Sequence, residues 1–266
     1  MPLTPNRILE AARLLLDHRR RGAVLAALPE PCRPQSAEDG YAIQQALIAL
    51  RVEEEQARPI GWKIGATNPA AREMLGVVEP FFGILLSTLT SDAPARFTAS
   101  EMFQRIVEPE IALEINTDLD PADAPFDADA IRRAVRAVLP AIEIVDTPLA
   151  DGIAAGGPSL IADGGAHGRW VRGTPVAGWR DLDLIEQRVT LTVDGALVCE
   201  GRGGNVEGGP LAATAWLANA LAVRGLGLKA GDFVSTGTTT QPIAATAGQS
   251  LVADFGAIGS IGLRFD

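Results

Sequence analysis

Hydrophobic residues in the first part of the chain recur at the spacing of amphipathic helices. Residues 5–20 repeat apolar positions every three or four residues, and residues 37–57 do so again before a charged end, "RVEEEQAR". The Pro-rich stretch "LPEPCRPQS" separates the two segments. We therefore expect residues 1–58 to form a helical N-terminal section built on a pair of helices.

The pattern changes at residue 59, where short apolar segments punctuated by glycine predict strands. Such segments include "PIGWKIGA", "RIVEPEIALEI", "PAIEIVD", "DFVSTGTTT", "SLVADFG" and "IGSIGLRF". Residues 188–203 alternate around Asp194-Gly195, which predicts a hairpin. Helices are expected only at 68–76, 127–139 and 210–225.

Strands dominate after residue 59 and do not alternate regularly with helices. This order predicts an α+β fold, with a mixed sheet or roll in residues 59–266 following the helical section.

Composition narrows the classes of partner. The 266 residues carry a net charge of −10, which repels phosphate backbones and argues against nucleic acid. No segment reaches the ~20 apolar residues of a membrane span, and the N-terminal charges follow the apolar stretch rather than precede it. Two cysteines provide no disulfide framework. We expect a soluble cytoplasmic protein, and we interpret the basic run His18–Gly22 as a solvated helix end.

Carboxylates occur within otherwise apolar strand segments. Because side chains alternate along a strand, Glu108 and Glu110 share one face at a separation of roughly 7 Å. They would repel each other unless water or a cation intervened. Glu143 lies in a second apolar strand, "LPAIEIVD", where an unpaired charge would be costly.

The residues alone leave two interpretations open: a solvated polar face, or a site for a hard divalent ion. Because the chain has only two histidines, a His-rich zinc or iron site is disfavoured. Three carboxylates and water would suit Mg²⁺ or Mn²⁺.

Several segments, taken in order, resemble the 2-keto-4-pentenoate hydratase group of the fumarylacetoacetate hydrolase superfamily. They are "GWKIGATNPAAREMLGV", "VEPEIALEINTDL", "LPAIEIVD", "AWLANALAVRGLGLKAGDFVSTG" and "GAIGSIGLRF". The resemblance implies a mixed β-roll of the superfamily's C-terminal-domain type, a homo-oligomer, and a divalent ion held by Glu108, Glu110 and Glu143. It also implies that Lys63 is the active-site lysine.

The same resemblance matches the turn "STGTTTQP" to a loop over the substrate carboxylate, so Thr236, Gly237 and Thr238 are expected to bind substrate. Two departures concern proton transfer. Phe81 stands where the group often has Asp, and would narrow the pocket or favour an apolar substrate tail. In "DGGAHG", Ala166 replaces a serine.

Asp163 and His167 flank that replaced serine. Asp163 could position a water molecule or Lys63, or could cap a turn, and His167 could be a general acid or base or a loop residue.

The expected function is a metal-dependent hydratase that adds water to a 2-hydroxy-2,4-dienoate or 2-oxo-enoate in the breakdown of aromatic compounds. Two alternatives stay open: a 4-oxalocrotonate-type decarboxylase with the same metal site, and a non-catalytic relative that binds 2-oxo acids. Hydrolysis of a C–C bond ranks lower, because His18 is a poor candidate for activating water.

Overall fold

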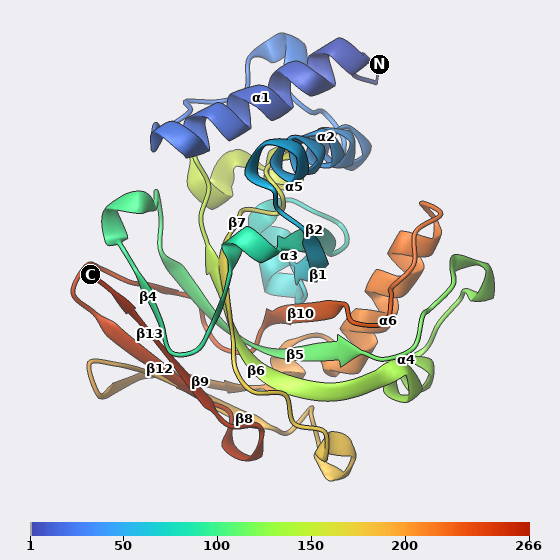
Figure 1. Ribbon diagram of the computed structural model, residues 1–266, viewed down its shortest axis with the longest axis vertical. Coiled ribbons are helices and arrows are strands. Elements are labelled where there is room, and N and C mark those ends of the chain that lie inside the picture. The colour runs from blue at the N-terminus through green and yellow to red at the C-terminus, as the bar shows by residue number, and fades with distance from the viewer. Residues whose placement is uncertain (1) are drawn as a thin grey trace.

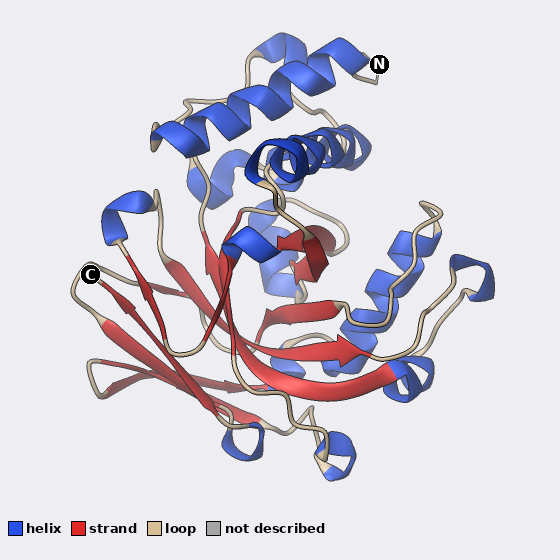
Figure 2. Cartoon of the chain, viewed as in Figure 1, coloured by secondary structure: helices blue, strands red, loops and turns tan. Residues whose placement is uncertain are grey.

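The computed structural model describes residues 2–266, which form two curled sheets and several helices (Figure 1, Figure 2). The helices are α1 (Pro5–Arg21), α2 (Ala37–Glu55), α3 (Pro69–Leu75), α4 (Ala128–Ala134), α5 (Gly157–Ala162) and α6 (Gly209–Ala222). Helices α1, α2 and α5 lie above the sheets, and α4 and α6 lie beside the larger sheet. Among residues 2–266, no helix is long and apolar enough to cross a lipid bilayer.

The larger sheet has the strand order β2-β1-β10-β5-β6-β7-β3, with β11 paired to β5. Its strands are β1 (Pro59–Gly65), β2 (Phe81–Leu86), β3 (Thr90–Asp92), β5 (Ile106–Ile115), β6 (Val135–Val145), β7 (His167–Arg172), β10 (Phe233–Thr238) and β11 (Ile243–Ala244). The second sheet has the order β4-β13-β12-β8-β9. Its strands are β4 (Ala95–Phe97), β8 (Arg188–Val193), β9 (Ala196–Arg202), β12 (Ser250–Asp254) and β13 (Ser260–Phe265). The expected α+β roll is confirmed.

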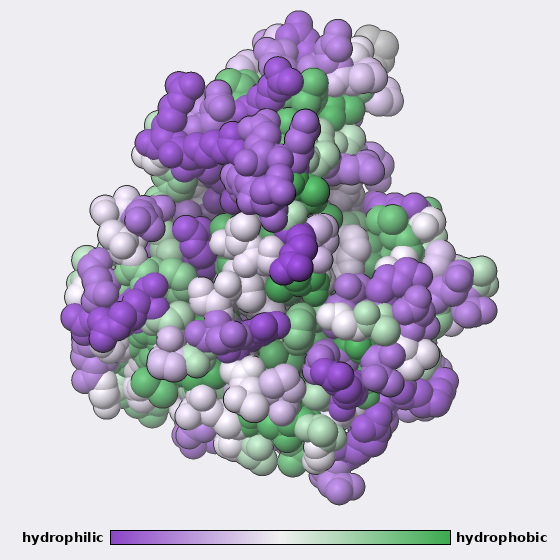
Figure 3. All heavy atoms as spheres, in the orientation of Figure 1, coloured by the Kyte–Doolittle hydropathy of each residue, from purple (hydrophilic) through white to green (hydrophobic). Residues whose placement is uncertain are grey.

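The two N-terminal helices form as predicted, each with recognisable end signals. Pro5 occupies the first turn of α1, and Gly22 ends it in a left-handed conformation at φ 58°. The Ser36 side chain caps α2 by accepting a hydrogen bond from the backbone N–H of Asp39. The buried faces of both helices share an apolar cluster with Leu149 and Ala162. In Figure 3, hydrophilic residues dominate the outer surface of α1.

One helix prediction was too long. Residues 127–139 were expected to be helical, but α4 ends at Ala134 and residues 135–139 begin strand β6. The backbone of this stretch pairs with β5, for example Val138 with Leu113. Strand pairing in the core therefore overrides the local helical pattern. The predicted hairpin is confirmed, with left-handed φ angles of 49° at Asp194 and 83° at Gly195 between β8 and β9.

Strands β5 and β6, at the centre of the larger sheet, have one face toward the apolar core and the other toward the glutamate cluster. Val107, Ile111 and Leu113 of β5 point into the main apolar core and are fully buried. Alternation places the glutamates of β5 on the opposite face. In the antiparallel register, Glu108 stands directly across from Glu143 of β6.

Candidate metal and active site

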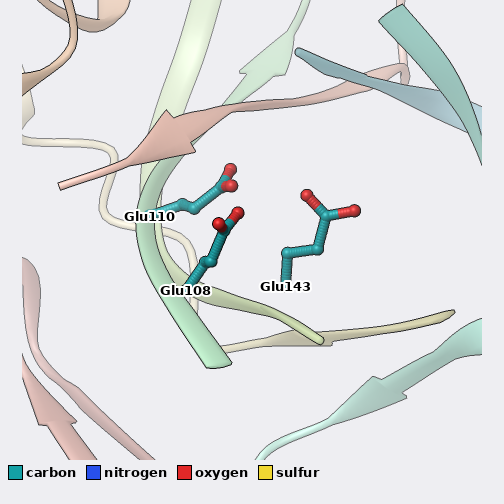
Figure 4. A group of neighbouring side chains, drawn as sticks. All are labelled: Glu108, Glu110 and Glu143. Atoms are coloured by element: carbon teal, nitrogen blue, oxygen red, sulfur yellow. The ribbon is translucent and has the colours of Figure 1, made fainter. Parts of the chain in front are cut away.

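The register of β5 and β6 brings three carboxylates together. Glu108, Glu110 and Glu143 each offer an oxygen within 4.8 Å of the others, and Figure 4 shows their carboxyl groups converging. Glu108 is half-buried, whereas Glu110 and Glu143 are buried. A solvated polar face is therefore the wrong interpretation of these strands.

Glu110 is held in place by β10. Its Oε2 accepts hydrogen bonds from the Ser235 hydroxyl at 2.5 Å and from the backbone N–H of Gly237 at 3.0 Å. Trp170 Nε1 in turn donates to Ser235 Oγ at 2.9 Å. The other oxygen of Glu110 is buried and has no hydrogen-bond partner among residues 2–266. A buried, unpartnered carboxylate oxygen beside two further carboxylates fits a hard divalent cation.

The electrostatics of the cluster are asymmetric. Burial and repulsion from Glu143 raise the pKa of Glu108 to about 7, although Lys63 opposes this shift. Burial and the neighbouring glutamates raise the pKa of Glu110 well above its usual value. Burial also acts to raise the pKa of Glu143, but Lys63 and His167 together lower it. Without a cation, Glu143 keeps its charge and the other two carboxyls tend to hold protons.

Lys63 approaches this cluster from β1. Its Nζ lies 3.4 Å from Glu143 Oε1 and 5.5 Å from the centre of the Phe81 ring, and the side chain is buried. A Cβ at Gly165 would lie 2.8 Å from Lys63 Cε. Glycine at this position therefore leaves the space that the lysine occupies.

His167 contacts the cluster from β7. Its Nδ1 lies 2.8 Å from Glu143 Oε1. Burial lowers the pKa of His167, although Glu143 acts to raise it, so the neutral imidazole is favoured near neutral pH. Because ionised Glu143 can only accept, His167 must donate through Nδ1–H. The imidazole then orients Glu143, and it does not line the cavity described below.

Asp163 is paired with a residue that the sequence analysis did not select. Arg19, from α1, donates to both carboxylate oxygens of Asp163, at 2.8 Å and 2.6 Å, and also to the backbone oxygen of Asp146. The interpretation of His18–Gly22 as a solvated helix end is therefore wrong for Arg19, whose side chain is only 10% exposed. Helical spacing is the signal that could have identified Arg19, because it lies four residues after Leu15 and seven after Ala12 on the buried face of α1, whereas Arg20 and Arg21 lie off the centre of that face.

A cavity of about 590 Å³ opens beside the carboxylates. Its wall includes Lys63, Glu108, Phe81, Gly237 and Thr238. The structure thus places these five predicted site residues around one cavity.

Thr236 is an exception among the predicted substrate-binding residues. Its hydroxyl donates to the backbone oxygen of Ile111, and the side chain is fully buried away from the cavity wall. Gln241, a weaker candidate in the turn "STGTTTQP" that the resemblance matches to the substrate loop, also lines the cavity. Sequence reasoning missed other cavity residues, and nothing local marks them: Asn68, Met74, Leu75 and Asn205.

No family model matches the chain. Among curated proteins, it is 35% identical over 260 residues to the 2-keto-4-pentenoate hydratase of Paraburkholderia phymatum, covering 98% of each chain.

Two solved structures extend the comparison. The 4-oxalocrotonate decarboxylase from Pseudomonas putida G7, complexed with magnesium and adipate, superposes with a TM-score of 0.92 at 25% identity over 99% of each chain. A protein from Yersinia pestis CO92, described as belonging to the fumarylacetoacetate hydrolase family, has a TM-score of 0.60 at 20% identity. It covers 78% of this chain and 94% of its own, and shows the likeness of fold.

Proposed function

The chain belongs to the 2-keto-4-pentenoate hydratase group of the fumarylacetoacetate hydrolase superfamily, and we propose that it is a divalent-metal-dependent hydro-lyase of that group. Its substrate is a 2-hydroxy-2,4-dienoate or the related 2-oxo-enoate, and its product is a 4-hydroxy-2-oxo acid. The observation that carries this proposal is the convergence of three carboxylates beside a cavity that also receives Lys63.

Glu108, Glu110 and Glu143 would hold the metal, and Mg²⁺ or Mn²⁺ suits their oxygen ligands best. The ion would supply Lewis-acid polarisation of the 2-oxygen of the substrate. The Mg²⁺ of the solved decarboxylase complex supports Mg²⁺ for this chain.

The protein's own groups prepare the site. Lys63 places a positive charge where negative charge develops on the substrate, in a buried setting that strengthens the interaction. His167 fixes the orientation of Glu143 through its Nδ1–H. Gly237 and Thr238 lie on the cavity wall and would contact the substrate there. Their own donors are engaged within the protein, because the Gly237 N–H donates to Glu110 and the Thr238 hydroxyl donates to the backbone oxygen of Thr240. Asp163, engaged by Arg19, acts as a positioning residue for the turn before His167 rather than as a proton carrier.

We also propose that the enzyme acts in the cytoplasm as a homo-oligomer, in the breakdown of aromatic compounds. The resemblance of the ordered motifs to this superfamily is the basis for the assembly and the pathway, and the order of charge and apolar residues at the N-terminus is the basis for the compartment. Light scattering after size-exclusion chromatography tests the assembly, and a single-chain mass would contradict it.

Loss of dienol absorbance in the presence of Mg²⁺ and freshly prepared 2-hydroxypenta-2,4-dienoate tests the function. We expect turnover well above the enzyme-free rate, and a loss of at least 100-fold in Glu110→Gln. Glu114→Gln is the matched control, because Glu114 lies on the same strand face but pairs with Arg136 outside the cluster. Absence of turnover in the Mg²⁺-loaded protein would contradict the proposal.

Decarboxylation is the second candidate, because the solved decarboxylase matches nearly the whole chain. Release of CO₂ from 4-oxalocrotonate, compared with hydration of the dienoate, separates the two reactions. We expect hydration to be the faster reaction. A higher kcat/KM for CO₂ release would instead identify a decarboxylase.

A further inference from the structure

The strand face that carries the metal ligands changes from acidic to apolar within one residue pair. Glu108 stands across from Glu143, and the next pair on the same face is Ile106 across from Val145. That pair lies about 7 Å further along the strands. Both of its members line the cavity. The cavity therefore continues from the carboxylates onto an apolar wall.

Other elements complete this apolar end. Leu75 of α3, Ile153 of the 3₁₀ turn Gly152–Ala155, and Leu160 of α5 pack in one apolar cluster with Ile106 and Val145. All five residues also line the cavity. An acid whose carboxylate and 2-oxygen lie at the glutamates would direct its carbon chain past Ile106 and Val145 into this cluster.

The far end of the cavity contains no charge. Among the lining residues, all within 2–266, Lys63 and Glu108 are the charged ones, and both lie at the metal end. The cation on α3, Arg72, does not line the cavity and is paired with Glu207 at 2.6 Å. A second carboxylate on the substrate would therefore find no cation to pair with, and it would lose hydration against the apolar cluster, which is unfavourable.

The cavity is also larger than the smallest substrate of this class requires. Its volume of about 590 Å³ falls in the range of roughly 300–1,000 Å³ that accommodates drug-sized ligands. A five-carbon oxo acid is much smaller than such a ligand and would leave the apolar end in contact with water.

We infer that this site selects 2-hydroxydienoates and 2-oxo acids that carry an uncharged apolar chain beyond the fifth carbon, and that it discriminates against diacids. This inference rests on the proposed function, because it assumes that the oxo-acid end binds at the glutamates. Ile106, Val145, Leu75 and Leu160 are the residues that set the preference.

Binding of unreactive saturated acids tests the inference without turnover. Calorimetry of the Mg²⁺-loaded protein compares 2-oxopentanoate, 2-oxoheptanoate and 2-oxoadipate. Because each of the two extra methylenes contributes about 0.8 kcal/mol when buried, or roughly fourfold in affinity, we expect 2-oxoheptanoate to bind about fifteenfold more tightly than 2-oxopentanoate. We expect 2-oxoadipate to bind more weakly than either. Equal affinities for the two monoacids, or tighter binding of the diacid, would overturn the inference.

Two variants locate the preference. Ile106→Ala should reduce the gain from the longer chain to threefold or less, whereas Val252→Ala, at an exposed position of β12, should keep it. Met74→Arg places a cation on the cavity wall, and Met74 is already 62% exposed. Its expected effect is at least a tenfold gain in 2-oxoadipate affinity. Val78→Arg adds the same charge outside the cavity and should give no gain. Indistinguishable behaviour of each variant and its control would refute the assignment.

Turnover separates failure of this inference from failure of the proposed function. If 2-hydroxypenta-2,4-dienoate is hydrated but a longer alkyl dienoate has no higher kcat/KM, the chain preference fails and the hydratase stands. If the saturated acids bind with the expected order but no dienoate is hydrated, the proposed function fails and the binding preference stands.

Discussion

Ser235 fixes the orientation of the Glu110 carboxylate, one of the three proposed metal ligands. Its hydroxyl donates to Glu110 and accepts from Trp170, so the carboxylate is fixed from behind. We expect Ser235→Ala to weaken Mg²⁺ binding about 10- to 100-fold, because partners that orient a ligand typically contribute that much. Calorimetric titration with Mg²⁺ measures the effect, with Ser260→Ala on the exposed edge of β13 as the control. Unchanged affinity in Ser235→Ala would show that the bond does not orient Glu110.

Proton competition should make metal binding depend on pH. Because the pKa of Glu108 is raised to about 7, this carboxyl is protonated below that pH and must lose its proton to bind a cation. Mg²⁺ affinity should therefore rise between about pH 6 and pH 8, with proton release detectable by calorimetry in buffers of different ionisation enthalpy. A flat affinity profile over this range would contradict the raised pKa.

Whereas Mg²⁺ affinity should rise with pH, the free energy of unfolding of the metal-free protein should fall with pH because of Glu108. A carboxyl whose pKa is raised on folding stabilises the protein at pH values below its ordinary pKa, and this contribution is lost as pH rises through the folded value. The free energy of unfolding of the wild type relative to Glu108→Gln should thus fall as the pH rises from about 4.5 to about 7 and level off above that. The difference reports Glu108 together with its effect on Glu110 and Glu143, whose charges interact with it. Parallel pH profiles would exclude this effect.

Residue roles could be predicted only in part. Alternation along the strands indicated that Glu108 and Glu110 share a face, and the apolar setting of Glu143 marked it as unusual. The helical spacing of Ala12 and Leu15 could have placed Arg19 on the buried face of α1, but its partner Asp163 was not predictable, because the two residues are far apart in the chain. Thr236 was predicted to bind substrate but is buried away from the cavity. A sequence match to a turn does not reveal which of its side chains face the cavity.

At the scale of elements, α1 is joined to the active-site turn by a buried ion pair between Arg19 and Asp163. Arg19→Met leaves Asp163 as a buried, unpaired carboxylate, which should cost about 3–5 kcal/mol in the free energy of unfolding. Arg20→Met breaks only the more exposed pairs with Glu54 and Glu55 and should cost less than about 1 kcal/mol. Urea denaturation measures both values.

A second substitution tests the cause of that loss. If the unpaired charge is responsible, adding Asp163→Asn to Arg19→Met should recover part of the stability. An equal cost for Arg19→Met and Arg20→Met, or no recovery in the double variant, would mean that packing of α1 rather than the ion pair stabilises this region.

Element types followed from the sequence wherever end signals were strong. Asn68 caps α3 and Gly76 ends it, as the pattern indicated. Residues 135–139 were misassigned because their pattern also suits a helix, and only pairing with β5 decides the outcome. Strand order and register were beyond local inference, since they depend on contacts between residues far apart in the chain.

At the scale of the whole molecule, the helical section and the roll meet at the site. The apolar cluster of α1 and α2 includes Leu149 and Ala162, which flank the glutamate strand and the active-site turn. The division of the chain at residue 58 into two separate parts stays a prediction. The family and the β-roll could be predicted from the order of motifs along the chain. The preference of the cavity for an apolar substrate chain could not, because it depends on how side chains from five elements pack together.

The claim that three glutamates hold one divalent cation is tested most directly by a crystal structure of the protein with Mn²⁺. Data recorded where manganese scatters anomalously should show one strong peak, about 2.0–2.3 Å from an oxygen of each of Glu108, Glu110 and Glu143. A peak bonded to other residues, or well-ordered carboxylates without a peak at saturating Mn²⁺, would contradict the claim.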